Sequence, residues 1–376
     1  MATNSGFSSL LKRWITSTDS VLLFSVFIII AIGAWISIAS TPAVAIKLGL
    51  PPFHFVKHHL LIVPISVFTI VFVSFLQARH IRRISVFGYL VCLILVAGTL
   101  VLGEETKGAS RWLSIFGFSL QPSEFLKPVL SVMTAWFIAE QYRDRRFPGI
   151  FLSLICVSIT MPLLLLQPDI GMAAVVLGTW VAQLFISGLS TFMIGTFMIT
   201  TIGLSAGAYF IFPHVADRFD RFMLRGGEDD ADLYQIHKSL EAFKSGGLFG
   251  KGPGEGVVKT LVPDAHSDFV FSVIGEEFGL IMCLALITLY IVIIVRTIGR
   301  LMRSSSIFSF SAVFGILFQT NLQVLINICT SLNLMPTKGM TLPFISYGGS
   351  SMLASSVSVG ILLALTKRNA IIKESL

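Results

Sequence analysis

Long apolar segments constrain this chain more than any other feature. A membrane-crossing helix needs about 20 mostly apolar residues, and about ten segments of the sequence approach that length. The segments are continuous rather than alternating, which favours helices over the strands of a membrane barrel. Only 12% of the residues are charged and 54% are hydrophobic, a composition that excludes a soluble globule. The predicted fold class is therefore an all-α polytopic membrane protein, with spans at 20–39, 59–77, 84–102, 123–139, 148–166, 169–187, 190–212, 268–295, 307–331 and 346–366.

The distribution of basic residues predicts the topology. Five clusters at one set of helix ends hold 14 Lys and Arg residues, whereas the short loops at the opposite ends hold 6. Basic residues mark the cytoplasmic side of a membrane, so both termini are expected in the cytoplasm. We expect a single transmembrane domain over residues 1–376, with a large extracytoplasmic loop at 213–267 between the seventh and eighth helices.

The end of that loop combines glycines with ionisable side chains. Six glycines within 246–256 could bring backbone amides close to a diphosphate, although a plain flexible loop fits the composition as well. His266 and Asp268 precede the eighth apolar segment. Asp268 is expected on the first turn of a helix at the outer membrane surface, as an N-cap or as a general base. Glu276 and Glu277 lie two to three turns further, where a carboxylate is costly unless it is paired or hydrated.

Other charged residues are predicted on the same membrane face. Glu124 and Lys127 are three residues apart in sequence, so they share a helix face and can pair. Asp169 opens the sixth span, as an N-cap or as a functional carboxylate. Arg111, beside Trp112, either holds a phosphate or anchors the chain at the interface. Basic and acidic groups on one face suit an anionic lipid-linked substrate.

A stretch rich in proline and glycine precedes the tenth span. Residues 335–351 read Met-Pro-Thr-Lys-Gly-Met-Thr-Leu-Pro-Phe-Ile-Ser-Tyr-Gly-Gly-Ser-Ser, which is typical of a broken, re-entrant helix entry that lines a cavity. Lys338, Ser346, Ser350 and Ser351 would then face a polar substrate. The alternative is an ordinary loop followed by small-residue helix packing.

Three blocks of the sequence together resemble the SEDS (shape, elongation, division, sporulation) family of bacterial cell-wall polymerases. The first is Lys-Gly-Ala-Ser-Arg-Trp at 107–112 with Gln-Pro-Ser-Glu at 121–124. The second runs from the glycine-rich segment through Pro-Asp-Ala-His-Ser-Asp at 263–268, and the third is the stretch at 335–351. Within the family, Pro-Thr-Lys-Gly at 336–339 resembles the division branch rather than the elongation branch.

The resemblance implies a peptidoglycan glycosyltransferase that polymerises lipid II into glycan strands during septal wall synthesis. It implies Asp268 as the general base and undecaprenyl diphosphate as the leaving group. A divalent cation, Mg²⁺ or Mn²⁺, is left open, and no organic cofactor is expected. The expected substrate-binding residues are Arg111, Glu124, Lys127, Asp169, Gln235, Lys259, His266, Lys338 and Ser350.

The resemblance also implies partners and a location. A class B penicillin-binding protein transpeptidase, other divisome proteins and the bacterial inner membrane at the division septum are expected, and no nucleic acid is. Two other functions stay open. A lipid II flippase would use the same cavity and charges, although their concentration on the outer side disfavours access from both faces. A non-catalytic divisome scaffold would not need Asp268.

Overall fold

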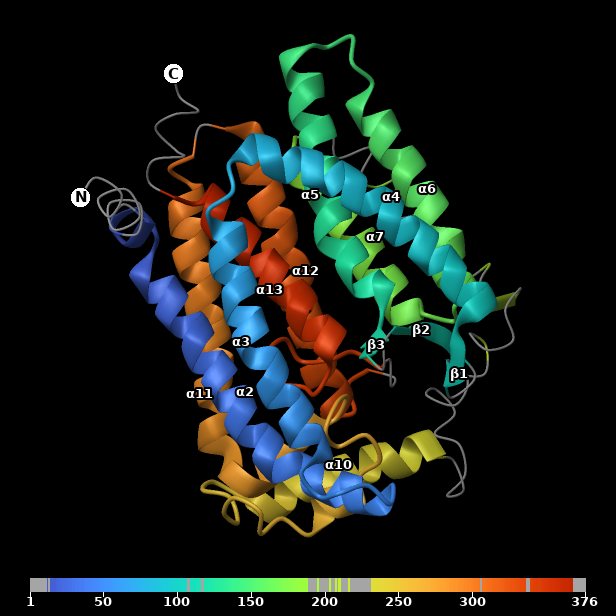
Figure 1. The fold of residues 1–376 in the computed structure, drawn as a ribbon, viewed down its shortest axis with the longest axis vertical. Coiled ribbons are helices and arrows are strands. Elements are labelled where there is room, and N and C mark those ends of the chain that lie inside the picture. Colours follow the sequence, from blue (N-terminus) through green and yellow to red (C-terminus); the bar gives the residue numbers. More distant parts are fainter. Residues whose placement is uncertain are drawn as a thin grey trace, which may run out of the picture.

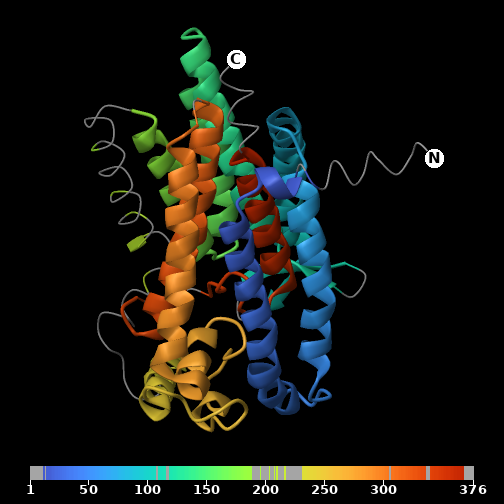
Figure 2. The same ribbon diagram turned by 90° about the vertical axis from the view of Figure 1, so that its left-hand side faces the viewer.

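The fold is described by a computed structural model for residues 12, 14–106, 109–115, 118–188, 195, 203, 207, 209–210, 216, 231–304, 306–335 and 339–367. These residues form a bundle of long helices (Figures 1 and 2). The predicted seventh span, 190–212, lies outside the described residues apart from isolated positions. Each of the other nine predicted spans coincides with a helix: α2 (Ser20–Lys47), α3 (His54–Ser74), α4 (Ala78–Leu102), α5 (Pro122–Arg143), α6 (Gly149–Leu166), α7 (Ile170–Ile186), α11 (Val270–Leu301), α12 (Ile307–Ser331) and α13 (Gly349–Leu365).

The length and apolarity of these helices confirm the polytopic membrane fold. Six described helices, α2, α3, α4, α6, α11 and α12, are long and apolar enough to cross a membrane. α7 and α13 are apolar but have only 17 residues each, and α5 carries two acidic and two basic side chains. Large hydrophobic side chains such as Phe68, Phe87 and Ile94 are exposed on the outer faces of the bundle, as lipid-facing surfaces require.

The two ends of the bundle differ. The start of α2, the end of α13 and the connection between α5 and α6 lie at one end (Figure 1). Helix α10 (Ala231–Gly246), from the large loop, lies across the opposite end (Figure 1). This arrangement agrees with the predicted topology, in which the termini and the large loop are on opposite sides of the membrane.

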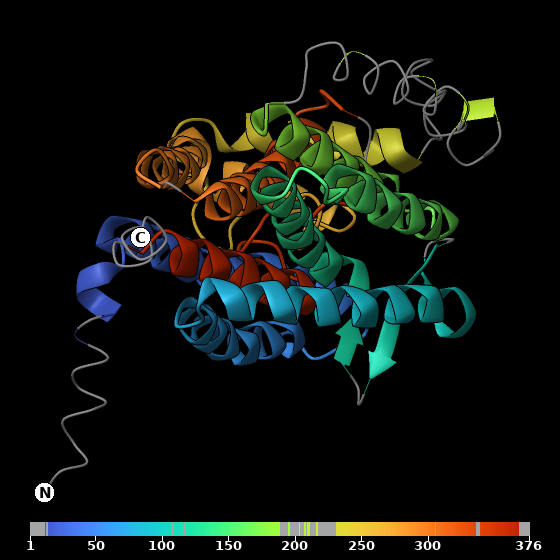
Figure 3. The same cartoon turned by 90° about the horizontal axis from the view of Figure 1, so that it is seen from above.

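The sequence did not predict α10, which packs against α11, or the short 3-10 helix η1 (Val258–Thr260) that follows it. It also did not predict a small antiparallel sheet between α4 and α5, with strands β1 (Glu104–Thr106), β2 (Ala109–Ile115) and β3 (Phe118–Leu120) in that order. Figure 3 shows this sheet beside α4. The sheet matters for the site because β2 carries Arg111.

The two largest hydrophobic clusters of the described residues lie on either side of a seam. One cluster is built mainly by α2, α11, α12, α13 and residues 342–345, and the other by α4, α5, α6 and α7. α12 packs against both α5 and α7, so these three helices form the seam. Polar side chains in the seam are shielded from lipid, and they need partners there because no water replaces a lost hydrogen bond in a dry interior.

Candidate active site

Asp268 lies in the turn that leads into α11 and is half-buried. The helix begins at Val270, and its N-cap is Phe269, which makes no side-chain capping bond. The expectation that Asp268 lies on the first helical turn is therefore wrong, and so is the alternative that it is the N-cap. The backbone amides of Ser267 and Asp268 donate to the carbonyl of Asp264 at 3.0 and 3.1 Å, which closes the turn and presents Asp268 at its end.

Arg111 extends from β2 to the turn between α6 and α7. Its Nη1 lies 3.7 Å from Asp169 Oδ1, its Nε donates to the carbonyl of Gln167 at 3.1 Å, and its Nη2 donates to that of Pro168. Asp169 is also the N-cap of α7, with Oδ1 accepting the amide of Met172 at 3.2 Å. The predicted spans 148–166 and 169–187 are thus joined by a short turn, and Asp169 caps α7 while it holds Arg111.

Asp268 and Arg111 converge on one space beside Gly339. A Cβ atom placed on Gly339 would lie 3.6 Å from Asp268 Oδ2 and 3.9 Å from Arg111 Nη1. Gly339 has a φ of +61°, a conformation that glycine adopts readily and other residues do not. The Arg111 side chain is 15% exposed. A half-buried carboxylate and a partly exposed guanidinium thus lie within 4 Å of one point.

Glu124 and Lys127 form the predicted pair on α5. Lys127 Nζ donates to Glu124 Oε2 at 2.8 Å and to Gln323 Oε1, on α12, at 2.7 Å. Gln323 in turn donates through Nε2 to the carbonyl of Thr341 at 2.9 Å. Both charged side chains are only 5% exposed. The pair is confirmed, but direct contact of either side chain with substrate is not what the structure shows, because both are enclosed in the seam.

The stretch before α13 is broken and buried, as the re-entrant prediction requires. Residues 339–348 are non-helical, and residues 340 and 342–346 are buried inside the bundle. A Cβ atom on Gly33 of α2 would lie 2.0 Å from the carbonyl oxygen of Phe344, so only glycine permits this approach. The hydroxyl of Tyr290 donates to the carbonyl of Pro343 at 2.7 Å. The segment is therefore fixed from two sides.

The serines of this stretch do not face an open substrate site, contrary to the prediction. Ser350 is 3% exposed; its Oγ donates to the carbonyl of Ser119 and accepts the amide of Gln121, each at 3.0 Å. Ser346 and Ser351 are also buried and hydrogen-bonded. In a dry interior these hydroxyls satisfy local polar groups, and Ser350 ties α13 to the connection between β3 and α5.

Lys259 is likewise an internal partner rather than a substrate ligand. Its ammonium pairs with Glu277 and donates to the carbonyl of Ala39 at 3.0 Å, and the residue is 5% exposed. Glu276 accepts the backbone amides of Val258 and Lys259 at 2.8 and 2.7 Å. The predicted role of Lys259 is thus wrong, because burial leaves the side chain no access to a ligand. The same contacts explain how two carboxylates are tolerated in α11.

The glycine-rich segment packs against a kink in α11. Gly279, inside that helix, has a φ of +76°. The amides of Lys251 and Gly252 donate to the carbonyls of Glu276 and Glu277, each at 2.9 Å. These two amides satisfy carbonyls exposed by the kink, so they do not form the diphosphate cradle that the glycines suggested.

Three predicted site residues are less closely tied to this geometry. His266 is half-buried and stacks on Phe55, with ring centroids 5.4 Å apart and a second ring, Tyr347, at 5.6 Å. Gln235 is half-buried on α10, and Lys338 lies outside the described residues. A role in substrate binding stays a prediction for all three.

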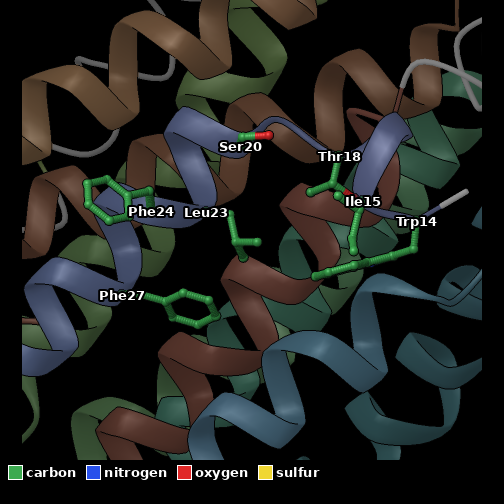
Figure 4. A pocket seen from close by; sticks show the side chains of 7 residues that line it. All are labelled: Trp14, Ile15, Thr18, Ser20, Leu23, Phe24 and Phe27. Atoms are coloured by element: carbon green, nitrogen blue, oxygen red, sulfur yellow. The ribbon is translucent and has the colours of Figure 1, made fainter. Parts of the chain in front are cut away.

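The divalent cation stays a prediction. Within the described part of the chain, no three His, Cys, Asp or Glu side chains gather around one point, but an ion held between a carboxylate and a substrate diphosphate needs only one or two protein ligands. An apolar cavity of about 220 Å³ lies elsewhere, at the start of α2, and is lined by Trp14, Ile15, Thr18, Ser20, Leu23, Phe24 and Phe27 (Figure 4). It holds no ionisable group and is not a candidate for catalysis.

Sequence reasoning missed two buried amides of α12, Gln323 and Asn327. Gln323 bonds Lys127, as described above, and Asn327 donates to the carbonyl of Asp268 at 2.9 Å. The available signal was their spacing: residues four apart share a helix face, and α12 is otherwise largely apolar. Polar side chains on an inner helix face mark functional or structural networks.

Similarity to known proteins covers almost the whole chain. Residues 19–371 match the family model of the FtsW, RodA and SpoVE cell cycle proteins. A protein of Caulobacter vibrioides named as a probable peptidoglycan glycosyltransferase FtsW is 40% identical, over 95% of this chain and 91% of that protein. A protein of Coxiella burnetii with the same name is 31% identical, over 93% and 96% of the two chains.

Solved structures share the fold. A chain of a peptidoglycan synthase complex matches with a TM-score of 0.76 and 24% identity, over 93% of this chain and 97% of that one. The rod shape determining protein RodA of Thermus thermophilus matches with a TM-score of 0.67 and 26% identity, over 93% and 96%. Together these likenesses support the helical arrangement described above.

Proposed function

The chain belongs to the FtsW, RodA and SpoVE family of cell cycle proteins, and on that premise we propose that it is a peptidoglycan glycosyltransferase that polymerises lipid II. Membership confirms the resemblance to the SEDS family. The relatives that share 40% and 31% of its sequence carry the FtsW name, which agrees with the division branch rather than the RodA branch. The protein is a multi-pass membrane protein.

The reaction joins the 4-hydroxyl of a GlcNAc to C1 of a MurNAc that carries undecaprenyl diphosphate. The acceptor oxygen forms a bond to C1 while the bond from C1 to the diphosphate oxygen breaks, which inverts an α-linked donor to a β-linked strand. A hydroxyl is a poor acid, so its proton must pass to a base during attack. The leaving diphosphate takes the electron pair and benefits from a nearby positive charge.

One observation carries the assignment of these roles. The carboxylate of Asp268 and the guanidinium of Arg111 lie within 4 Å of one point beside Gly339. Asp268 would accept the proton of the acceptor hydroxyl, and Arg111 would stabilise charge on the diphosphate. Asp169 orients the guanidinium through the 3.7 Å ion pair. Lys127 is a poorer diphosphate ligand than Arg111, because its ammonium is 5% exposed and already bonded.

The partners and location follow from the proposed reaction. New glycan strands must be crosslinked, so we place a class B penicillin-binding protein transpeptidase beside this protein, with other divisome proteins at the septum. The peptidoglycan synthase complex among the structural neighbours supports such a pairing. We also place both termini in the cytoplasm and the large loop outside, on the 14-to-6 division of basic residues.

Polymerisation of labelled lipid II by purified protein, with and without the transpeptidase, tests the proposal. Asp268→Asn keeps the size of the side chain and removes its basicity. It should express and bind lipid II like the wild type, while the polymerisation rate falls by about 10²–10⁴-fold. Asp264→Asn is the matched control, since it makes the same change in the same turn at a φ of +54° that asparagine tolerates.

The outcomes separate the proposed activity from its alternatives. A wild-type protein that makes no polymer with its partner, but equilibrates lipid II across vesicles, would be a flippase. A protein that does neither would be a scaffold. If Asp268→Asn polymerises at the wild-type rate, Asp268 is not the base, and a large loss in Asp264→Asn instead would assign the role to Asp264.

A further inference from the structure

Asn327 of α12 links the two chain segments that meet at the candidate site. Its side-chain Nδ2 donates to the carbonyl of Asp268 at 2.9 Å and to the carbonyl of Met340 at 2.6 Å. The residue is 1% exposed. An amide nitrogen carries two protons, so both donors of Asn327 are used, one on each segment.

The two carbonyls are adjacent to the groups that the reaction needs. One belongs to Asp268 itself, and the other to the residue after Gly339, beside which Asp268 Oδ2 and Arg111 Nη1 converge. Neither segment is helical at this point. A side chain on the helix α12 therefore supplies a fixed reference for two irregular stretches.

A neighbouring amide of α12 supports the same segment. Gln323, one helical turn before Asn327, donates to the carbonyl of Thr341 at 2.9 Å and to its hydroxyl at 3.1 Å. Gln323 also accepts from Lys127. The carbonyls of residues 340 and 341 thus each accept a hydrogen bond from a side chain of α12. Of these two side chains, Asn327 also bonds the carbonyl of Asp268.

We propose that Asn327 is a positioning residue for the general base. This role rests on the proposed function, in which Asp268 takes the proton of the acceptor hydroxyl. By bonding both carbonyls, Asn327 fixes the distance between the Asp268 carboxylate and the Gly339 segment against which the substrate would lie. Misplacement of a catalytic group by about 1 Å can cost about 10²-fold in rate, so one buried amide suffices to matter.

Two substitutions test the role. Asn327→Asp preserves the shape of the side chain but replaces the donating Nδ2 by a carboxylate oxygen, which cannot donate to either carbonyl. Asn327→Leu removes the donors without adding charge. Each should lower kcat for lipid II polymerisation by about 10–100-fold, counted per active molecule, while KM changes by less than about 3-fold. Asn321→Asp is the matched control, because the amide of Asn321 on the same helix bonds the carbonyl of Leu317 at 2.7 Å; it should stay within about 2-fold of wild type.

Amide hydrogen exchange provides a readout that does not depend on catalysis. Loss of the tether should raise exchange in peptides 264–270 and 339–346 together, in either Asn327 variant, with no change in the Asn321→Asp control. A residue that only stabilised the fold would lower the melting temperature and the yield, but not kcat per active molecule. Unchanged exchange, or an unchanged kcat in both variants, would refute the proposal. If exchange rises in both peptides but the wild-type protein makes no polymer, the proposed function is refuted, while the structural link made by Asn327 is supported.

Discussion

The buried ion pair of α5 offers a sharp test of how the seam is stabilised. Lys127 Nζ and Glu124 Oε2 are 2.8 Å apart, and both side chains are 5% exposed. At an effective dielectric constant of about 20, two unit charges at this distance attract each other by about 6 kcal/mol. Removing two ions from water costs several kcal/mol for each ion. The intact pair should therefore contribute little net stability, while either ion left alone should be strongly destabilising.

We expect Glu124→Gln and Lys127→Met each to lower the free energy of unfolding by about 3–5 kcal/mol, because each leaves one buried charge without its counterion. The double variant removes both charges. Its cost should be about 1–3 kcal/mol, the penalty for leaving Gln323 Oε1 without its donor. The double variant should thus be no less stable than either single variant, with a coupling energy of about 3 kcal/mol or more.

Unfolding by SDS in mixed micelles, followed by tryptophan fluorescence, measures these free energies. Gln323→Leu is a useful companion, since it removes the second partner of Lys127 but leaves the ion pair intact. If the two single costs add up to the cost of the double variant within about 0.5 kcal/mol, the charges are not coupled. In that case burial and distance do not determine the energy of this ion pair.

Two further predictions concern the ends of the bundle and its close packing. Burial raises the pKa of Asp19, at the start of α2, but hydrogen bonds from a backbone amide and from two arginines of α11 outweigh burial and keep the pKa below its ordinary value. The ionised Asp19 carboxylate therefore stabilises the folded protein above its ordinary pKa, and this contribution is lost as the pH falls through the pKa of the folded state. Asp19→Asn should lower the free energy of unfolding at neutral pH. The difference in unfolding free energy between the variant and the wild type should shrink below about pH 4, as measured by the same SDS unfolding. Gly33→Ala would place a Cβ 2.0 Å from the carbonyl oxygen of Phe344, so the variant should give no folded protein on size-exclusion chromatography. Gly98→Ala is the control: the new methyl has open space around it, so the change should be neutral or stabilising by up to about 1 kcal/mol. Equal behaviour of the two variants would contradict the close approach of Gly33 to Phe344.

The sequence was informative wherever the membrane itself imposes a rule. Apolar length placed nine spans that the structure describes, because a bilayer crossing requires a minimum number of apolar residues. The cost of a charge in an apolar environment likewise pointed to Glu124 with Lys127, and to Glu276 and Glu277 as groups that need partners. α10 and the small sheet between α4 and α5 obey no such rule. They are short and polar or mixed, and they form because they pack on the end or the side of the bundle.

Contacts between side chains on different elements could not be predicted from the sequence. Glu124 and Lys127 lie on one helix, so their pairing can be inferred from spacing. Lys259 pairs with Glu277 from a loop whose path no periodicity reveals, and it was therefore mistaken for a substrate ligand. Ser350 was misassigned for a similar reason. The sequence indicated a cavity next to this serine, but its hydroxyl bonds the backbone of Ser119 and Gln121 inside the protein.

Burial separates the carboxylates near the site that could act as the base. Glu124 and Asp169 are 4% and 2% exposed, and each is committed to a cation. A general base must come within hydrogen-bond distance of the hydroxyl it deprotonates, which an enclosed and paired carboxylate cannot do without rearrangement.

Asp264 and Asp268 are both half-buried, so accessibility alone does not separate them. Convergence with Arg111 beside Gly339 does, since it places a proton acceptor and a diphosphate ligand around one space. Comparison of the Asp264→Asn and Asp268→Asn rates therefore tests the geometry of the site, and equal losses in the two variants would mean that the turn as a whole, rather than one carboxylate, determines activity.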